Sequence, residues 1–171
     1  MKLGFSFRCA LLAAAIFISI KLITFLTHTQ FSGIGAYSGL ISLALLSIPL
    51  FIGIKHKRDV DFGGYITLRK AMIAGVAISI MSGIIISVYN YLHYKYIDTE
   101  VMSYWIAEAQ KLGAAEKKSE TEIQQAIDML KEFYAPFKQA TVALTGVLGA
   151  GTVLSFILST FLIKHAPESS N

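Results

Sequence analysis

The chain has 171 residues, of which 54% are apolar and only 15% are charged, and its mean hydropathy is +0.59. A soluble protein carries about 25% charged residues, so this composition excludes an ordinary soluble domain. The formal net charge of +4 would suit nucleic acid, but its distribution does not, since no charge falls in 22–54, 71–94 or 139–163. These gaps approach the roughly 20 apolar residues that cross a bilayer. The single Cys9 has no partner for an intrachain disulfide.

Four apolar runs predict an all-α polytopic membrane protein with a single membrane domain over residues 1–171. In chain order the runs are 9–27, 33–54, 71–92 and 141–163. Each run is long enough to span the hydrocarbon core as a helix. The first run follows Lys2 and Arg8, as the core of a signal peptide would. It is longer than the 7–15 residues of such a core and no A-x-A site follows it, so we expect the segment to be retained.

Two residues inside the runs are unusual for a membrane helix. Lys21 is the only charged residue in any run, and it lies less than two turns from the end of its run. Its apolar stem is long enough to carry the ammonium group to the interface. An intramembrane polar role for Lys21 is the alternative. Pro49 removes one backbone hydrogen bond from the second run and predicts a kink there.

Small side chains recur every four residues along the third run. They are Ala71, Gly75, Ser79, Gly83 and Ser87. In lipid, apolar burial does not drive helices together, so close backbone approach matters more. We therefore expect another helix to pack on this strip, from the same chain, from a second copy or from another membrane protein. Matching small residues in the second and fourth runs are Gly35, Gly39, Gly151, Ser155 and Ser159.

Lysine and arginine gather on one side of the predicted spans. Residues 55–70, called the joint below, carry Lys55, Lys57, Arg58, Arg69 and Lys70, whereas 28–32 carries neither residue type. Lys2 and Arg8 precede the first span, and Lys164 follows the fourth. Because such residues accumulate in cytoplasmic loops, we expect both termini and the joint to be cytoplasmic. Residues 93–140 are then outside, with an aromatic belt at 89–96.

The joint itself contains residues suited to a sharp turn. Asp59 and Asp61 offset part of its positive charge, and Gly63 and Gly64 allow the chain to reverse. Thr67 is placed to cap the third span. The basic residues are best explained as a cytoplasmic anchor, and contact with anionic lipid headgroups remains an alternative.

The outer segment 97–137 predicts an amphipathic helical hairpin over 98–112 and 120–135. Gly113 is expected to stop the first helix. Ser119 and Glu122 have the spacing of a capping box at the start of the second. An apolar stripe then follows at helical spacing: Ile123, Ile127, Leu130, Tyr134 and Phe137. Pro136 marks the bend into the fourth span. The stripe has three possible covers: the other helix, the bilayer surface or a partner protein.

Motifs of catalysis and metal binding are absent from the sequence. H-E-x-x-H, C-x-x-C, G-x-S-x-G and the phosphate-loop pattern do not occur. His28, His56, His93 and His165 lie near the predicted membrane boundaries, and no acidic residue or histidine is deep in a span. We therefore expect no catalytic residue, cofactor or metal site, and the absence of intramembrane acids disfavours a proton-coupled transporter.

The passage "GIKHKRDVDFGGYITLRKAMIAGVAISIMSG" resembles the signature of domain-of-unknown-function family 4199, small bacterial membrane proteins with four spans. In that family a "GI+-+RD...GG.I.F..A...G" pattern joins the second and third spans. The matching positions here are Gly53, Ile54, Lys55, Arg58, Asp59, Gly63, Gly64, Ile66, Ala71 and Gly75. Leu68 replaces the usual aromatic residue. The resemblance covers roughly 35–165, implies a bacterial inner-membrane protein of unknown activity and carries no catalytic residues.

These observations favour a non-enzymatic membrane protein of the bacterial inner membrane that acts as an interaction or regulatory component. Its partners would be the lipid bilayer and either a second copy or another membrane protein, contacted through the third span or the outer hairpin. Nucleic acid is not an expected partner. The alternative is a small transporter or channel-like component that uses the small-residue helix faces.

Overall fold

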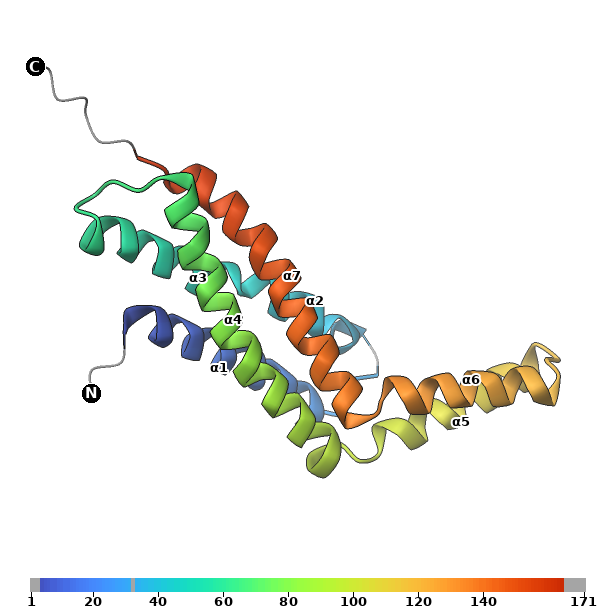
Figure 1. Ribbon diagram of the computed structural model, residues 1–171. Coiled ribbons are helices and arrows are strands. Elements are labelled where there is room, and N and C mark those ends of the chain that lie inside the picture. Colours follow the sequence, from blue (N-terminus) through green and yellow to red (C-terminus); the bar gives the residue numbers. More distant parts are fainter. Residues whose placement is uncertain (1–3, 32, 165–171) are drawn as a thin grey trace, which may run out of the picture. The chain divides into compact units, whose positions relative to one another are not determined.

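The computed structural model describes residues 4–31 and 33–164 (Figure 1). Three residues named above lie outside the described residues: Lys2 before the first span, Ser32 of the predicted loop, and His165. The chain divides into two compact units, one built from the described residues up to Ile86 and from Leu144 onward, and the other from Ser87–Ala143. The described residues are almost entirely helical, as expected; their one β-bridge joins Ile66 to Lys164.

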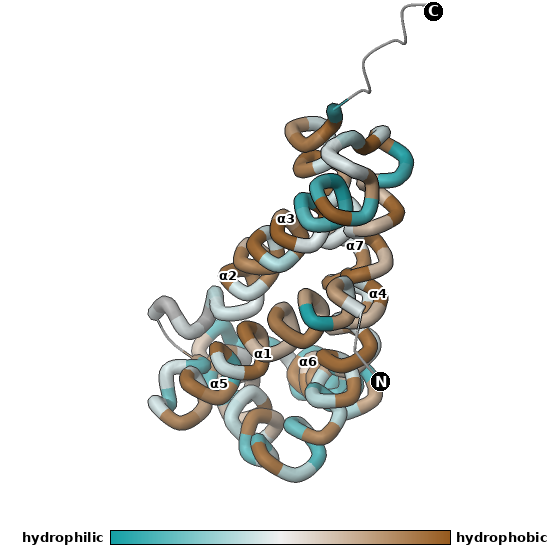
Figure 2. Tube along the Cα trace, turned by 90° about the vertical axis from the view of Figure 1, so that its left-hand side faces the viewer, coloured by the Kyte–Doolittle hydropathy of each residue, from teal (hydrophilic) through white to brown (hydrophobic). Residues whose placement is uncertain are grey.

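Four helical segments of the described chain are long and apolar enough to cross a membrane. They are Phe5–Leu26 (α1), Ser38–Asp61 (α2, α3 and η2), Leu68–Ile97 (α4 and η3) and Pro136–Leu162 (α7). Figure 2 shows mostly apolar residues along them, with hydrophilic residues gathered around the turn after α3. Each segment contains most of a predicted run, and α1, α4 and α7 begin several residues earlier than predicted. These helices begin earlier because their first turns contain polar residues, which the apolar runs leave out.

The second predicted span is not one uninterrupted helix. It begins with a 3₁₀ turn, Gly33–Tyr37 (η1), and continues as α2 (Ser38–Leu45) and α3 (Ser47–His56), with a break at Leu46. Pro49 has no N–H to donate to the carbonyl of Leu45. The interruption at Leu46 lies beside this carbonyl, about one turn before the proline, and Leu46 itself keeps helical backbone angles.

The core of the first unit forms where α1, α3 and α4 approach one another. A side chain at Gly53 of α3 would collide with Cδ1 of Ile78, and Sγ of Cys9 lies 3.4 Å from the same position. Leu50 and Ile54 are fully buried. The missing side chain at Gly53 thus lets the three helices meet closely, as small residues do in membrane helix packing.

In the second unit, α5 (Val101–Ala115) and α6 (Glu120–Phe133) lie side by side (Figure 1). The prediction that Gly113 stops the first helix is wrong, because α5 continues past it to Ala115. Gly113 instead makes room for its neighbour: a Cβ there would lie 2.5 Å from Cγ1 of Ile123. Helix α6 ends at Phe133, before the bend predicted at Pro136, which is the first residue of α7 (Pro136–Leu162).

The capping box predicted at the start of α6 is confirmed. Oγ of Ser119 accepts from the N–H of Glu122 at 3.3 Å, and Oε2 of Glu122 accepts from the N–H of Ser119 at 2.8 Å. The hydroxyl of Ser119 also donates to that carboxylate at 2.7 Å. These bonds lower the pKa of Glu122 below its ordinary value of 4.5.

Ser119→Ala is expected to destabilise the second unit by about 1 kcal/mol, because N-cap hydroxyls contribute about that much. Unfolding followed by the fluorescence of Trp105, the only tryptophan, would measure the change. Glu122 has a lower pKa folded than unfolded, so its stabilisation is present above pH 4.5 and is lost as the pH falls through the folded pKa. Glu122→Gln should remove that pH dependence, and an unchanged acid limb in this variant would contradict the capping account.

Candidate functional site

One compact turn after α3 contains Arg58, Asp59, Gly63 and Gly64 of the family motif. Nε of Arg58 donates to Oδ1 of Asp59 at 2.6 Å, and Nη2 donates to Oδ2 at 3.2 Å. Gly63 and Gly64 have φ of +62° and +93°, values that favour glycine because it has no Cβ. The N–H of Gly64 donates to the carbonyl of Arg58 at 2.8 Å. The motif therefore reverses the chain between α3 and α4 (Leu68–Leu92).

The joint is also attached to the end of α7. Nη1 of Arg58 donates to the carbonyl of Leu162 at 3.5 Å. Ile66 and Lys164 exchange backbone hydrogen bonds of 3.0 and 3.2 Å. The last carbonyls of a helix have no donor within the helix. The joint supplies a donor, Arg58, to one of these carbonyls, that of Leu162. Sequence reasoning missed this attachment because its partners are 104 residues apart and share no pattern.

The small-residue strip of α4 contacts α7 within the first unit. A Cβ at Gly75 would collide with Oγ of Ser155, and a Cβ at Gly151 would collide with Oγ of Ser79. A Cβ at Gly83 would lie 3.5 Å from Cγ1 of Val147. Each step of four residues along α4 thus meets a residue four positions earlier on α7, which is the pattern of two antiparallel helices.

The remaining predicted packing residues have other surroundings. Ser87 lies in the second unit, where its hydroxyl donates to the carbonyl of Ala140 at 2.9 Å. Lys21 is half-buried in the last two turns of α1. The expectation that Gly35 and Gly39 match the strip is wrong. Gly35 abuts the backbone of Thr29, and nothing lies within 4 Å of a Cβ at Gly39.

A group of polar side chains is buried at the end of α4 in the second unit. His93 is fully buried and Asp98 is 3% exposed, with 3.8 Å between Nε2 of the imidazole and Oδ2 of the carboxylate. The hydroxyl of Tyr89 lies 3.1 Å from Nδ1 of His93. The π-helical turn His93–Ile97 (η3) brings the pair together, since the N–H of Asp98 donates to the carbonyl of His93 at 2.8 Å.

Aromatic rings enclose this pair. Tyr94 meets the ring of His93 edge-on at 5.5 Å between centroids and lies 6.3 Å from Tyr134 of the turn after α6. Trp105 of α5 stacks on Tyr134 at 6.2 Å, with 14° between the ring planes. Burial, with a smaller contribution from Tyr94, raises the pKa of Tyr134 to about 12. The His93 cluster below means Tyr89, His93, Tyr94, Asp98 and Tyr134.

The His93 cluster is the strongest candidate functional site in the described chain. A buried imidazole lies beside a buried carboxylate here, and polar side chains are seldom buried in this way unless they are paired. π-Helical turns occur frequently at functional sites. The sequence placed His93 near a membrane boundary and gave no sign that Asp98 would be buried beside it. The deviation from α-helical spacing at η3 hides the pairing from a periodicity argument.

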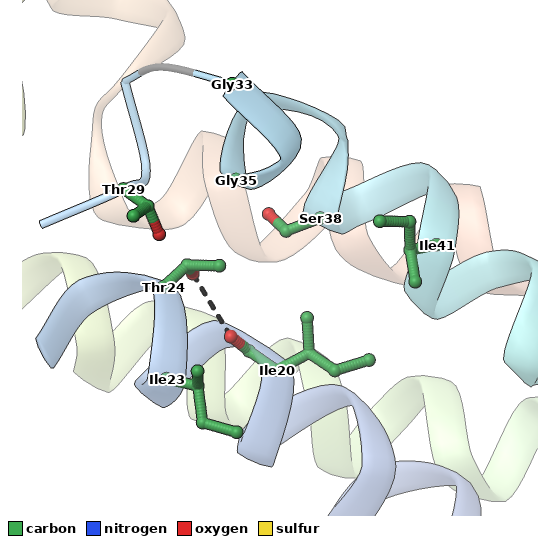
Figure 3. A pocket seen from close by; sticks show the side chains of 8 residues that line it. All are labelled: Ile20, Ile23, Thr24, Thr29, Gly33, Gly35, Ser38 and Ile41. Carbon is green, nitrogen blue, oxygen red and sulfur yellow. Dashed lines mark hydrogen bonds between the residues drawn. The ribbon is translucent and has the colours of Figure 1, made fainter. Parts of the chain in front are cut away.

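Other parts of the described chain offer less chemistry. An open pocket of about 470 Å³ lies between α1 and the segment Gly33–Ile41 (Figure 3). Ile20, Ile23 and Ile41 dominate its lining, and the hydroxyl of Thr24 donates to the carbonyl of Ile20 at 3.1 Å within its own helix. Among the described residues, no group of three or more His, Cys, Asp or Glu side chains is placed to share a metal ion.

Comparison with known proteins adds a family to this picture. Neither the curated proteins nor the solved structures contain a match to the chain. A model of the family described as "Protein of unknown function (DUF4199)" matches residues 5–164. That range contains all four long apolar helices, the joint and the His93 cluster. The match confirms the resemblance found in the joint motif, and the chain belongs to this family of unknown function.

Proposed function

We propose that this protein is a non-enzymatic, multi-pass protein of the bacterial inner membrane whose α5–α6 pair forms a hairpin outside the membrane and docks a partner protein. The joint and both chain ends are cytoplasmic in this proposal. Four helical segments of spanning length and the lysine–arginine bias of the joint support the placement.

The observation that carries the proposal is a second apolar stripe on α6. Ile123, Ile127 and Leu130 lie on one side of the helix, and Ile127 is buried. Met129 and Phe133 follow at a spacing of four residues and are 70% and 45% exposed. The side of α6 that carries Ile123, Ile127 and Leu130 is the side that packs within the chain. Met129 and Phe133 would supply the apolar centre of an interaction site, as exposed apolar patches rimmed by polar residues do.

The charged residues of α6 indicate which kind of partner would bind Met129 and Phe133. Helix α6 carries four acidic residues and one lysine: Glu120, Glu122, Asp128, Glu132 and Lys131. Helices that lie on a bilayer surface instead carry lysine and arginine on their polar face, because membrane surfaces are negative. An acidic rim around Met129 and Phe133 fits a protein surface with an apolar centre and basic edges.

Photocrosslinking in native membranes tests the docking. A photoreactive residue is placed at Phe133 in the exposed stripe, and the matched control is placed at Gln124, exposed on the polar side of α6. We expect a discrete protein adduct from position 133 and none from 124. Adducts only with lipid, or equal adducts from both positions, would contradict the proposal. The mass of the adduct separates a second copy of this chain from a different protein.

A second candidate function, a small transporter or channel-like component, is supported by the His93 cluster. Buried ionisable pairs in membrane proteins often serve proton or ion pathways. The described lining of the pocket beside α1 is uncharged, which gives an ion no fixed partner there. Flux measurements on reconstituted vesicles would distinguish the two functions, because a transporter would conduct without a protein partner.

A further inference from the structure

We propose that the joint and the end of α7 form a binding surface for anionic phospholipid headgroups. Its cations are Lys55, Lys57, Arg58, Arg69, Lys70 and Lys164, and its acids are Asp59 and Asp61. The inference rests on the membrane placement proposed above but is independent of docking by α6.

The surface keeps an excess of positive charge after its internal pairing is complete. The carboxylate of Asp59 pairs with the guanidinium of Arg58, and that of Asp61 pairs with Nζ of Lys57 at 2.6 Å. The other four cations, Lys55, Arg69, Lys70 and Lys164, are exposed and form no ion pair with a carboxylate of the described residues. These four charges are available to phosphate oxygens.

The fold brings cations from three segments to one place. The bridge between Ile66 and Lys164 attaches the end of α7 to the joint. The hydrogen bond from Arg58 lowers the pKa of the Asp59 carboxyl, and the positive charges of Lys55 and Lys164 lower it further. Lys164 lies about a hundred residues from the joint in the sequence. The β-bridge to Ile66 brings Lys164 to the joint and makes it part of this surface.

Two of these ammonium groups lie over aromatic rings. Nζ of Lys70 lies 4.5 Å from the centroid of the Phe62 ring, and Nζ of Lys164 lies 5.6 Å from that of Tyr65. Cation–π contacts of this length restrict a lysine without neutralising it. Val60, 65% exposed, adds an apolar side chain between the charges. Lysines beside aromatic and apolar groups are typical of surfaces that sit among lipid headgroups.

The position of the surface favours lipid over other anions. The joint connects α3 to α4 and is bridged to α7, so three segments of spanning length end there. Ends of spanning helices lie at headgroup depth. Phosphates of the cytoplasmic leaflet are then the nearest anions, and clustered Lys and Arg beside spanning helices bind such lipids.

Binding is measured with the full-length protein in nanodiscs of zwitterionic lipid containing increasing fractions of phosphatidylglycerol. The test variant combines Lys55→Gln, Lys70→Gln and Lys164→Gln. The matched control combines Lys111→Gln, Lys117→Gln and Lys131→Gln, which remove the same charge from α5, α6 and their turn. Mass spectrometry of the released complexes counts retained phosphatidylglycerol, and thermal unfolding establishes that both variants fold.

We expect phosphatidylglycerol to be enriched over the zwitterionic lipid by the unaltered protein and the control, with about a tenfold or greater loss of apparent affinity in the test variant. Equal enrichment in the test variant would overturn the inference. So would competition by inorganic phosphate at the same concentration as the lipid, which would show a free-anion site. A third overturning result is tighter binding of the surface to a nucleic acid probe than to phosphatidylglycerol.

Discussion

Gly151→Val is expected to destabilise the first unit by about 1–3 kcal/mol more than Gly149→Val, a cost typical of overpacked cores. A Cβ at Gly151 would collide with Oγ of Ser79 and lie 2.6 Å from its Cβ, an atom that cannot move without moving α4. Ser79 is fully buried, so no open space accepts the displaced atoms. Nothing lies within 4 Å of a Cβ at Gly149.

Both changes sit in α7 and carry the same intrinsic cost of valine in a helix, so their difference isolates the contact. Circular dichroism during titration with a denaturing detergent would measure it. Gly75→Val should behave like Gly151→Val, because a Cβ at Gly75 would meet Ser155. Equal stability of the Gly149 and Gly151 variants would show that α4 and α7 do not approach closely.

His93→Ala is expected to destabilise the second unit by at least about 2 kcal/mol. The change removes a fully buried side chain and leaves the buried Asp98 without its imidazole neighbour. A cavity in a packed region carries a cost of this order, and the loss of one interaction of a buried polar group adds to it. Tyr89 also loses the ring nitrogen that its hydroxyl faces at 3.1 Å.

Trp105 fluorescence reports this loss because its ring stacks on Tyr134 of the same cluster. The matched control is Tyr96→Ala, in the same π-helical turn but 66% exposed. We expect the control to change stability by less than about 0.5 kcal/mol. If His93→Ala were no more destabilising than Tyr96→Ala, the cluster would not be a packed site.

Features encoded locally were predictable from the sequence. Apolar length alone located the four long helices, and the Ser119–Glu122 spacing located a capping box whose bonds the structure contains. Such features need only neighbouring residues. Gly113 shows the limit of local reasoning, because its role depends on Ile123 of the next helix. A glycine that ends a helix and a glycine that admits a neighbour look alike in one sequence.

The candidate site depended on contacts that the sequence does not display. Asp98 stands at the predicted start of the outer helices, and nothing in the sequence distinguishes it from the other acidic residues there. Burial arises from the π-helical turn, which shifts the spacing away from the helical period. The attachment of the joint to α7 joins residues 104 apart. The motif residue Arg58 was recognisable, but its hydrogen bond to the end of α7 was not.

The joint would meet anionic headgroups, and α6 would meet a protein. The His93 cluster lies where α4 leads into α5, so it would hold the connection between a spanning helix and the docking helices. Substitutions in the cluster should therefore weaken docking without changing lipid retention at the joint.

Topology is the claim on which the rest depends, and cysteine labelling tests it most directly. Cys9, which is buried, is replaced by alanine, and single cysteines are introduced by Val60→Cys in the joint and Thr121→Cys in α6, both at exposed positions. A membrane-impermeant maleimide is applied to spheroplasts before and after permeabilisation. The account predicts labelling of position 121 in intact spheroplasts and of position 60 only after permeabilisation. Labelling of position 60 from outside would contradict it.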